Sequence, residues 1–417
     1  MGLGLLGKGL GDAIFLAKAG AILTITDLKN EKELAPSLDK LKKYKNIKYV
    51  LGKHEISDFE NCDFVLKAQG VPLNSPYIEH ARKSKIPIRM DDELFISLLP
   101  KNVKVVGVTG TRGKTTVASL IFHILKSSGK KAHLGGNIRG LATLSLLPKI
   151  KSGDIVVLEL SSWQLQGFHE QKISPNISVF TNFMDDHMNY YSSRKEYYYD
   201  KSAIYAYQKK GDICVVGSSL GSFTTKSKKI IAESNDVPKN WKLPLVGEHN
   251  LENISLSVAV VKALRIPIIK IKKGVESFKA VEGRLQLVKK IKGVGIYNDN
   301  NSTTPEATVA ALKAFPNKNI ILIMGGADKG LDTKELIKTI LKYTKKVILL
   351  PGTGTETLPT LTRTVLASSL QDAVKKALEF AEKGDVILFS PAFASFGLFK
   401  NEYDRNDQFM NIIKKLK

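Results

Sequence analysis

Short apolar runs alternate with polar, helix-like stretches over the first hundred residues. The runs AILTIT, KYVLG, DFVLKA and KIPI are each followed by a stretch whose charged positions recur at helical spacing. Strands that alternate with helices favour a parallel sheet, because the crossover between parallel strands needs a segment about as long as a helix. Residues 1–98 are therefore predicted to form an α/β domain.

The same alternation continues in two further regions. In the second we predict the strands VKVVGVT, DIVVLEL, ISVFTN and DICVVG, followed by the helical NLENISLSVAVVKAL, whereas the polar stretch 218–229 reads as a loop. In the third, which begins near Leu285, GVGIYND, NIILIMGG, KVILL and DVILFS are separated by helical TPEATVAALKAF and SLQDAVKKALEFAEKG. We interpret the chain as three α/β domains at 1–98, 99–284 and 285–417.

Composition narrows the class of protein. The chain has 417 residues, of which 43% are hydrophobic and 25% are charged, and its mean hydropathy is −0.09. These values exclude wholesale disorder and a multispanning membrane protein. Cys62 and Cys214 lie far apart with no metal-ligand spacing, which favours a reducing cytoplasm over a disulfide framework. Lys8, Asp12 and Lys18 interrupt the apolar start, so a signal peptide is not expected.

The formal net charge is +23, from 63 basic and 40 acidic residues. Such a charge raises the question of nucleic-acid binding, but the lysines are spread along the chain beside acids and are not interleaved with aromatic residues. The pattern therefore predicts no nucleic-acid partner. A basic surface does favour small anionic ligands such as nucleotides and phosphates.

The strongest motif is a glycine-rich loop between an expected strand and an expected helix. It reads Gly110-Thr111-Arg112-Gly113-Lys114-Thr115-Thr116. Glycines let backbone N–H groups curl around phosphate oxygens, a helix N-terminus faces them, a lysine adds a cation, and a threonine hydroxyl can bind Mg²⁺. The motif indicates a nucleoside triphosphate loop, in a variant form with Val108 where the strict pattern has glycine.

A second glycine motif, Gly2-x-Gly4-x-x-Gly7, is followed by Asp27 at the end of the next expected strand. It is typical of a loop that binds a nucleotide diphosphate, although a plain turn between strand and helix explains it too. Because the loop begins at residue 2, we expect the first strand of this domain to be missing.

Acidic side chains and a histidine also follow the central strands. Glu159 ends DIVVLE, Asp186 and His187 follow ISVFTNFM, and Lys201 lies further on. Open parallel sheets bind ligands at the carboxyl ends of their strands, so these groups are expected to face the phosphates. A carboxylate with a hydroxyl and phosphate oxygens suits Mg²⁺, whereas Glu159 could also cap a helix. His187 is equally compatible with a structural role, and spacing alone makes Lys201 a plain helical lysine.

Three polar loops follow strands in the third region. They are Tyr297–Pro305, Met324–Gly330 and Ser390–Phe396. Each is compatible with ordinary turn chemistry. Together at one rim of a sheet they favour a binding face.

These motifs resemble the Mur ligase family along essentially the whole chain. GVTGTRGKTT resembles its TGTxGK(T/S) loop, LGGNIRG its GGNIG, and LELSSWQL its ELSSFQL. TNFMDDHMNYY is similar to its N-x-x-x-DH segment, VGEHNLENISLSVAV to its GxHNxxN helix, and SPAFASFGLFKN to its SPACAS-x-D-x-FKN loop. The resemblance is strongest to the D-glutamate-adding members, and it implies an N-terminal domain for a uridine nucleotide, a central ATPase and a C-terminal amino-acid domain.

The resemblance also assigns expected roles to residues. Catalysis would involve Lys114, Glu159, His187 and Lys201, with Mg²⁺ at two sites held by Thr115, Glu159, His187 and a carbamylated Lys201. ATP would contact Gly110, Thr111, Gly113, Lys114, Thr115, Thr116, Asn250, Asn253, Arg284 and Asp299. The uridine substrate would contact Leu5, Leu6, Asp27, Lys29, Gly70, Asn137 and His187, and D-glutamate would contact Thr303, Lys329, Ser395 and Phe396.

The implied reaction is ATP-dependent amide formation through an acyl phosphate, in peptidoglycan precursor synthesis. Its substrates would be ATP, UDP-N-acetylmuramoyl-L-alanine and D-glutamate, with ATP and Mg²⁺ as cofactors. Domain closure is expected, because water must be kept from the acyl phosphate. The resemblance further implies a monomer.

Several positions depart from the family pattern. Asn301 replaces the usual lysine, Gly283 replaces a common histidine, and KAQG replaces SPG before Val71. After FKN, the expected aromatic residue is displaced by one position to Tyr403. These departures affect individual site residues and the identity of the amino acid more than the ligase function.

Four alternatives remain open. A sibling Mur-type ligase could use another amino acid, although the DNPR motif of the diaminopimelate- or lysine-adding enzyme is absent. Folylpolyglutamate synthase shares the central machinery but starts close to its phosphate loop. An NAD-dependent oxidoreductase leaves the Lys114 loop unexplained. A non-catalytic nucleotide-binding scaffold would fit the missing first strand and Asn301.

Overall fold

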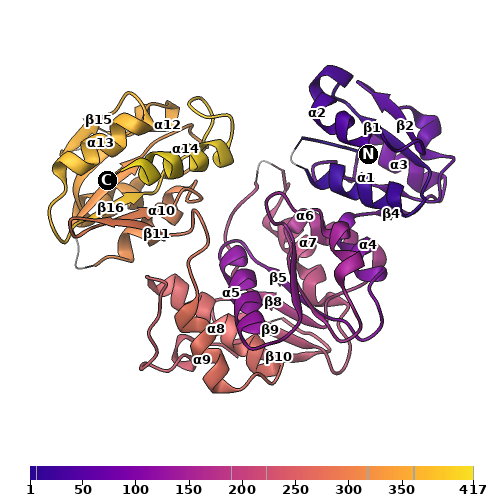
Figure 1. The fold of residues 1–417 in the computed structure, drawn as a ribbon, viewed down its shortest axis with the longest axis horizontal. Coiled ribbons are helices and arrows are strands. Elements are labelled where there is room, and N and C mark those ends of the chain that lie inside the picture. Colours follow the sequence, from indigo (N-terminus) through magenta and orange to yellow (C-terminus); the bar gives the residue numbers. More distant parts are fainter. Residues whose placement is uncertain (6, 189, 222, 317–318, 360–361, 417) are drawn as a thin grey trace. The chain divides into compact units, whose positions relative to one another are not determined.

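The computed structural model describes residues 1–5, 7–188, 190–221, 223–316, 319–359 and 362–416. They divide into two compact units. One contains Met1–Lys239 and Glu252–Val275, and the other contains Asn240–Leu251 and Glu276–Lys417. Figure 1 shows α/β architecture in both, with sheets flanked by helices. The three predicted domain boundaries stay a prediction.

The N-terminal part of the first unit has two short parallel strand pairs. β1 (Leu23–Asp27) pairs with β2 (Ile47–Leu51), and β3 (Val65–Leu66) pairs with β4 (Ile88–Arg89). The helical elements around them are α1 (Lys8–Lys18), α2 (Glu31–Leu41), η1 (Ile56–Phe59), α3 (Pro76–Lys83) and α4 (Asp91–Ser97). Both pairs lie where the apolar runs predicted strands.

The first residues lie between these two strand pairs. The Met1 amine donates to the Leu66 carbonyl at 2.9 Å, and the Met1 carbonyl accepts from the Ala68 N–H. On the other side, the Gly2 N–H donates to the Thr26 carbonyl at 2.8 Å. Met1 and Gly2 therefore join β1 to β3, in the position where a first strand would pair, although they are not assigned as a strand themselves.

The central sheet is parallel throughout, in the order β10-β9-β8-β5-β7-β6. Its strands are β5 (Lys104–Thr109), β6 (Ala132–Gly136), β7 (Ile155–Glu159), β8 (Ile177–Phe180), β9 (Ile213–Gly217) and β10 (Lys228–Ala232). β5, β7 and β8 are almost wholly buried, as continuous apolar runs in a covered parallel sheet should be. The four strands predicted here are confirmed.

The same region contains the helices that follow the phosphate loop along the chain. They are α5 (Lys114–Ser127), α6 (Ser162–Gln171), α7 (Arg194–Ala206), α8 (Glu248–Ala263) and α9 (Ile268–Ser277), with the shorter turns η2 (Thr143–Lys149) and η3 (Ser234–Asp236). The predicted loop at 218–229 ends as β10 begins at Lys228, so its last two residues belong to an edge strand.

The second unit contains another six-stranded sheet, in the order β11-β12-β16-β13-β14-β15. Its strands are β11 (Gln286–Ile291), β12 (Val294–Asn298), β13 (Ile320–Met324), β14 (Thr344–Leu349), β15 (Thr364–Leu366) and β16 (Val386–Phe389). β11 is antiparallel and the other pairs are parallel. The four strands predicted here are confirmed, and β11 and β15 were not predicted.

Helices cover both faces of that sheet. They are α10 (Pro305–Lys313), α11 (Lys334–Tyr343), α12 (Thr353–Glu356), α13 (Leu370–Phe380) and α14 (Glu402–Lys415). Two buried apolar clusters lie on opposite faces, one including Leu322 and Leu388 and the other Ile321 and Ile387. This alternation is the period-two pattern of strands buried on both sides. Of the helices in the described ranges, none combines the length and apolar character needed to cross a bilayer.

Candidate active site

The glycine-rich loop connects the end of β5 to the start of α5. Gly110 has φ +145° and Gly113 has φ +83°, conformations that side chains rarely adopt. A Cβ on Gly110 would lie 1.9 Å from Thr181 Oγ1, and one on Gly113 would lie 2.2 Å from Asn253 Oδ1. Both glycines are therefore required by space as well as by backbone angle.

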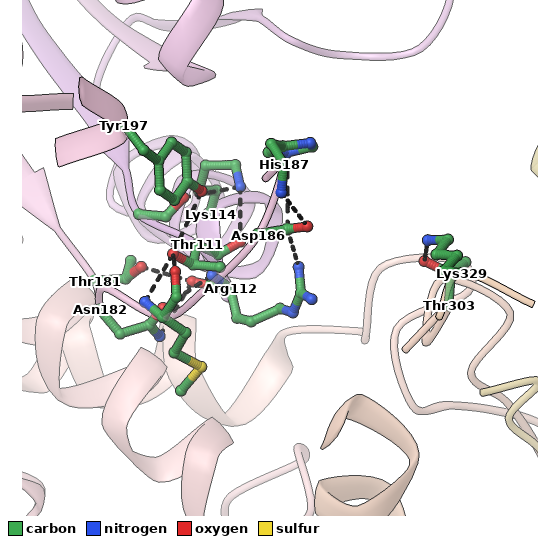
Figure 2. Close-up of polar contacts among 12 residues, drawn as sticks. Thr111, Arg112, Lys114, Thr181, Asn182, Asp186, His187, Tyr197, Thr303 and Lys329 are labelled. Atoms are coloured by element: carbon green, nitrogen blue, oxygen red, sulfur yellow. Dashed lines mark hydrogen bonds and ion pairs between the residues drawn. The ribbon is translucent and has the colours of Figure 1, made fainter. Parts of the chain in front are cut away.

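The segment after β8 binds the loop along its length (Figure 2). The N–H of Thr111 donates to the Asn182 carbonyl at 3.0 Å, and the N–H of Arg112 donates to Asn182 Oδ1 at 2.9 Å. Thr181 Oγ1 donates to the Arg112 carbonyl at 2.6 Å. Thr111 Oγ1 accepts from the Met184 N–H at 3.0 Å. These bonds hold the loop in shape before any phosphate binds.

Two lysines converge on one carbonyl of this loop. Lys114 Nζ donates to the carbonyls of Gly110 and Thr111, each at 3.0 Å. Lys201 Nζ, carried by α7, donates to the Gly110 carbonyl at 2.9 Å and lies 4.6 Å from the centre of the Tyr197 ring. Spacing alone made Lys201 an ordinary helical lysine, but its side chain is 1% exposed and reaches the phosphate loop.

The environment of Lys201 favours the neutral amine. Burial lowers the pKa of the Lys201 amine well below its ordinary value, and the nearby Lys114 cation lowers the pKa further. Asp186 and Asp200 oppose the shift without reversing it. A lowered pKa enlarges the fraction of Lys201 in the neutral, nucleophilic form relative to an exposed lysine.

Glu159 lies at the carboxyl end of β7. Within the sheet, Glu159 pairs with Val108 of β5 and with Gly136 of β6. It therefore lies on the strand next to β5, the strand that leads into the phosphate loop. The residue is 3% exposed, and its carbonyl accepts from the N–H of Asn137 at 2.7 Å. The adjacent ends of β6 and β7 thus bring Asn137 beside Glu159.

His187 has a strained backbone beside an aromatic cluster. Its φ of +59° lies in the left-handed region, and its N–H donates to Asp186 Oδ1 at 3.0 Å. The ring centre lies 4.8 Å from Trp163 and 6.0 Å from Tyr197. Burial lowers the pKa of the His187 imidazole, with Lys114 and Lys201 adding to the effect, and Asp186 only partly offsets it. The neutral form that a metal ligand needs is therefore favoured.

The residues around the loop fit Mg²⁺ only with help from a bound phosphate. Within the described ranges, no three His, Cys, Asp or Glu side chains gather closely enough to hold a metal ion. Thr115 begins α5 directly after Lys114, and Glu159 ends the strand beside β5. A hydroxyl and one carboxylate leave most of the Mg²⁺ coordination sphere to phosphate oxygens and water, which is how proteins usually hold this ion.

Among the predicted uridine residues, Leu5, Asp27, Lys29 and Gly70 lie in the N-terminal part of the first unit, whereas Asn137 and His187 follow strands of the central sheet. Asp27 Oδ2 accepts from the Gly4 N–H at 3.0 Å, and Asp27 Oδ1 accepts from the Lys29 N–H at 2.9 Å. Gly2, Gly4 and Gly7 all have positive φ, so the loop uses its glycines as the motif predicted. Leu5, Lys29 and Gly70 are exposed, and Leu6 lies outside the described residues.

The other residues predicted to contact ATP beyond the phosphate loop, and those predicted to contact D-glutamate, belong to the second unit. Asn253 is an exception, because it belongs to the first unit and faces Gly113. Asp299 is 6% exposed and accepts from the Leu285 N–H and from the hydroxyls of Ser302 and Ser390. Burial raises the pKa of its carboxyl to about 6. Asn250 Nδ2 donates to the Val246 carbonyl at 2.8 Å. Arg284 is close enough to Asp299 to lower the pKa of that carboxyl slightly.

Among the predicted amino-acid residues, Thr303 and Lys329 are brought together. Lys329 Nζ donates to Thr303 Oγ1 at 3.2 Å, across two different loops (Figure 2). Ser395 is buried and Phe396 is 64% exposed, so these neighbours point into different surroundings. Asn301 and Gly283, two of the positions that depart from the family pattern, lie next to each other. The Asn301 N–H donates to the Gly283 carbonyl, and a Cβ on Gly283 would lie 3.0 Å from Asn301 Nδ2.

Sequence reasoning missed several side chains that build these sites. Arg112 forms an ion pair with Asp186, and Asn182 holds the loop by both its backbone and its side chain. Arg405 is completely buried and donates to the side chain and carbonyl of Asn300. The role of Asn182 could have been predicted from the sequence, because this residue follows a buried strand next to the loop. In contrast, no sequence feature around Arg405 indicated that its side chain is buried.

Comparisons with known proteins agree with this geometry. Residues 108–233 match the family described as Mur ligase middle domain, and residues 283–393 match Mur ligase, glutamate ligase domain. The UDP-N-acetylmuramoylalanine--D-glutamate ligase of Borreliella burgdorferi (strain ZS7) is 37% identical over 447 residues, covering 100% of this chain and 97% of the relative. The protein of the same name from Roseiflexus sp. (strain RS-1) is 34% identical, covering 99% and 97%.

Solved structures share the fold at low identity. The UDP-N-acetylmuramate-alanine ligase MurC of Thermotoga maritima gives a TM-score of 0.59 at 20% identity, covering 100% of this chain and 98% of that one. The MurF ligase of Thermotoga maritima in complex with ADP gives 0.57 at 20% identity, covering 86% and 98%. At such identity these likenesses concern the fold alone.

The full-length similarity to these relatives and the family models that match identify the chain as an ATP-dependent amide ligase, and its fold is α/β. The chain belongs to the Mur ligase family.

Proposed function

We propose that this protein joins D-glutamate to UDP-N-acetylmuramoyl-L-alanine in an ATP-dependent reaction of peptidoglycan precursor synthesis. The observation that carries the proposal is the meeting of Lys114 and Lys201 at the Gly110 carbonyl, beside the carboxyl end of β7. It brings two amines to the phosphate loop, which follows the strand next to the one that Glu159 ends. The choice of D-glutamate rests on the full-length similarity to relatives of that name.

The residues around the loop have distinct proposed roles. Gly110, Thr111 and Gly113, with Lys114 and the Thr115 and Thr116 hydroxyls, are proposed to hold the ATP phosphates. The backbone N–H of Thr111 is not among the phosphate donors, because it donates to the Asn182 carbonyl. Asn253 faces Gly113 and supports that loop, which agrees with a place at the nucleotide. Asn250, Arg284 and Asp299 are proposed to contact the rest of ATP. Asp299 directly follows β12, at the strand end where ligands bind in such sheets, whereas Asn250 lies in the first turn of α8 and Arg284 precedes β11.

We also propose that Mg²⁺ is held at two positions. Thr115 and Glu159 would hold the first ion, and His187 and a carbamylated Lys201 would hold the second. The depressed pKa of Lys201 supports the modification, because only the neutral amine adds to CO₂. The carbamate changes a cation into an oxygen ligand of the kind Mg²⁺ prefers. When bound, these ions would neutralise phosphate charge during transfer.

The chain's own residues would then carry the reaction as follows. A carboxylate oxygen of the uridine substrate attacks the γ-phosphorus of ATP, ADP leaves, and an acyl phosphate forms. Lys114 offsets the negative charge of the phosphates during this transfer. The D-glutamate nitrogen attacks the acyl carbon, inorganic phosphate leaves, and the nitrogen loses a proton to give the amide. His187 and Asn137 are proposed to orient the reacting carboxylate.

The substrates are proposed to occupy separate regions. The uridine nucleotide would lie at Leu5, Leu6, Asp27, Lys29 and Gly70, where positive-φ glycines keep a loop open. D-glutamate would lie at Thr303, Lys329, Ser395 and Phe396, and the Lys329 ammonium, which donates to Thr303 Oγ1, is proposed to contact a carboxylate of this substrate. We further propose that the enzyme acts in the cytoplasm as a monomer.

An acceptor panel tests the proposal. Phosphate release from ATP is measured with UDP-N-acetylmuramoyl-L-alanine and a series of amino acids, each with and without the uridine substrate. We expect release only when both that substrate and D-glutamate are present. Equal turnover with L-lysine would reassign the enzyme to a sibling activity, and no turnover with any amino acid would refute a ligase function.

A further inference from the structure

Arg112 occupies the variable position of the phosphate loop and points away from the loop backbone. Its guanidinium Nη1 lies 2.6 Å from Asp186 Oδ2, in the segment after β8 (Figure 2). The same carboxylate accepts the His187 N–H at its other oxygen, at 3.0 Å. One carboxylate thus joins the phosphate loop to the residue proposed to face the reacting carboxylate.

His187 needs such support. A non-glycine residue in the left-handed region carries strain that the surroundings must hold in place. The carbonyl of His187 is fixed from one side by the N–H groups of Tyr190 and Tyr191, at 2.9 and 3.0 Å. Its N–H is fixed from the other side by Asp186. Asp186 could rotate away if nothing held its second oxygen.

We propose that Arg112 is a positioning residue that fixes His187 through Asp186 and so links the nucleotide loop to the acyl-substrate side of the site. The pair is partly covered, with side chains 34% and 22% exposed, so it is less screened than a surface pair. The proposal deepens the proposed function and rests on it for the meaning of His187. No metal ion is needed to form the pair.

A neighbouring ion pair provides a matched control. Arg194 Nε lies 2.8 Å from Asp185 Oδ1, one residue before Asp186 in the same segment. Those side chains are 58% and 67% exposed, and Arg194 belongs to α7, not to the phosphate loop. Arg194→Gln removes one cation that is paired with a carboxylate of this segment, as Arg112→Gln does, but without releasing Asp186.

The first readout is independent of activity. In protein labelled with ¹³C at histidine Cε1, the His187 signal is assigned by its absence in His187→Asn. We expect this signal to move in Arg112→Gln and in Asp186→Asn without added nucleotide, and to stay at the wild-type position in Arg194→Gln. Arg112→Lys, which keeps one cation, should return the signal part of the way.

The second readout is kinetic. Arg112→Gln should lower kcat about tenfold or more while changing KM for ATP less than about threefold, because the loop backbone that binds phosphates is unchanged. Asp186→Asn should do the same, and the double variant should be no worse than either single one, since both break one connection. Thermal unfolding of each variant shows whether it is folded.

Three results would overturn the proposal: a His187 signal unchanged in Arg112→Gln, an equal movement in Arg194→Gln, or losses that multiply in the double variant. The test stays separate from the proposed function. A wild-type enzyme without ligase turnover would refute that function, whereas the His187 signal would still decide whether Arg112 fixes this residue.

Discussion

Burial shifts the pKa of two key residues in opposite directions for the same reason. Removing a group from water disfavours its charged form, so the pKa of the Lys201 amine falls and that of the Asp299 carboxyl rises to about 6. The sequence around Lys201 and Asp299 does not reveal these pKa shifts, because the exposure of a side chain to water depends on the fold. Lys201 reaches the Gly110 carbonyl only after α7 packs against β5 and β8.

Lys201→Ala should remove nearly all turnover and leave the fold intact. If the carbamate supplies an oxygen ligand, a short carboxylate such as acetate or formate should restore part of the lost rate by entering the space. Protein treated with ¹³C-bicarbonate should show a carbamate carbon signal that is absent from Lys201→Ala. Unchanged kinetics in this variant, or no difference between the carbon spectra, would dismiss the modification.

Asp299→Asn should alter how stability depends on pH. With a folded-state pKa of about 6 against an ordinary value of 3.8, the folded protein keeps a proton that the unfolded chain has lost between these values. The protonated carboxyl therefore makes its full contribution to the stability of the folded state below pH ~4. This contribution falls as pH rises toward ~6, and the total loss is up to about 3 kcal/mol at ~1.4 kcal/mol per pKa unit. Urea unfolding of wild type and variant at several pH values measures the difference. A constant difference across this window would contradict the shift.

At the scale of elements, the phosphate loop depends on what packs against it. The β8 segment holds the loop through Thr181 and Asn182, and α8 places Asn253 against Gly113. The pattern of the loop itself was readable in the sequence, since strand, glycines and helix follow in order. The supporting contacts come from residues about seventy or more positions away, and local pattern does not contain them.

Gly113→Ala tests that packing with a close internal control. Gly113 and Gly129 flank α5, and both have φ +83°, but a Cβ on Gly129 meets nothing within 4 Å. Gly129→Ala should therefore cost only backbone strain, about 1 kcal/mol. Gly113→Ala should cost more and should weaken ATP binding at least about tenfold, as seen by calorimetric titration and urea unfolding. Equal effects of the two substitutions would show that Asn253 does not confine the loop.

Strand prediction succeeded where runs were apolar and β-branched. VKVVGVT and DIVVLEL became β5 and β7, whereas AHLGG in β6 and QLVKKI in β11 were missed because glycines or lysines interrupt the apolar pattern. β11 is half-exposed, which explains its lysines. Among site residues, those at strand ends were predictable from topology, whereas Arg112 as an ion-pair partner and buried Arg405 depended on tertiary packing.

At the scale of the whole molecule, the proposed residues are shared between the two compact units. The phosphate loop belongs to one unit, and Asp299, Thr303 and Lys329 belong to the other. The proposed binding residues for ATP, the uridine substrate and the amino acid therefore come from both units. Helix α8 crosses the division between Leu251 and Glu252, which ties Asn250 and Asn253 to one rigid element.

Hydrogen exchange tests this shared use of the chain. With a non-hydrolysable ATP analogue and the uridine substrate, we expect slower exchange in residues 110–116. Adding D-glutamate should also slow exchange in 324–330, because the Lys329 loop would then be covered. Protection confined to the first unit under all conditions would contradict the assignment of the amino-acid site.

The central claim is that the acid is activated as an acyl phosphate before the amine attacks. The most direct measurement follows oxygen from UDP-N-acetylmuramoyl-L-alanine labelled with ¹⁸O in its carboxylate, during turnover with ATP and D-glutamate. If the acyl phosphate forms, each inorganic phosphate released should carry one oxygen from that carboxylate. Phosphate without the label, formed while the amide product accumulates, would contradict it.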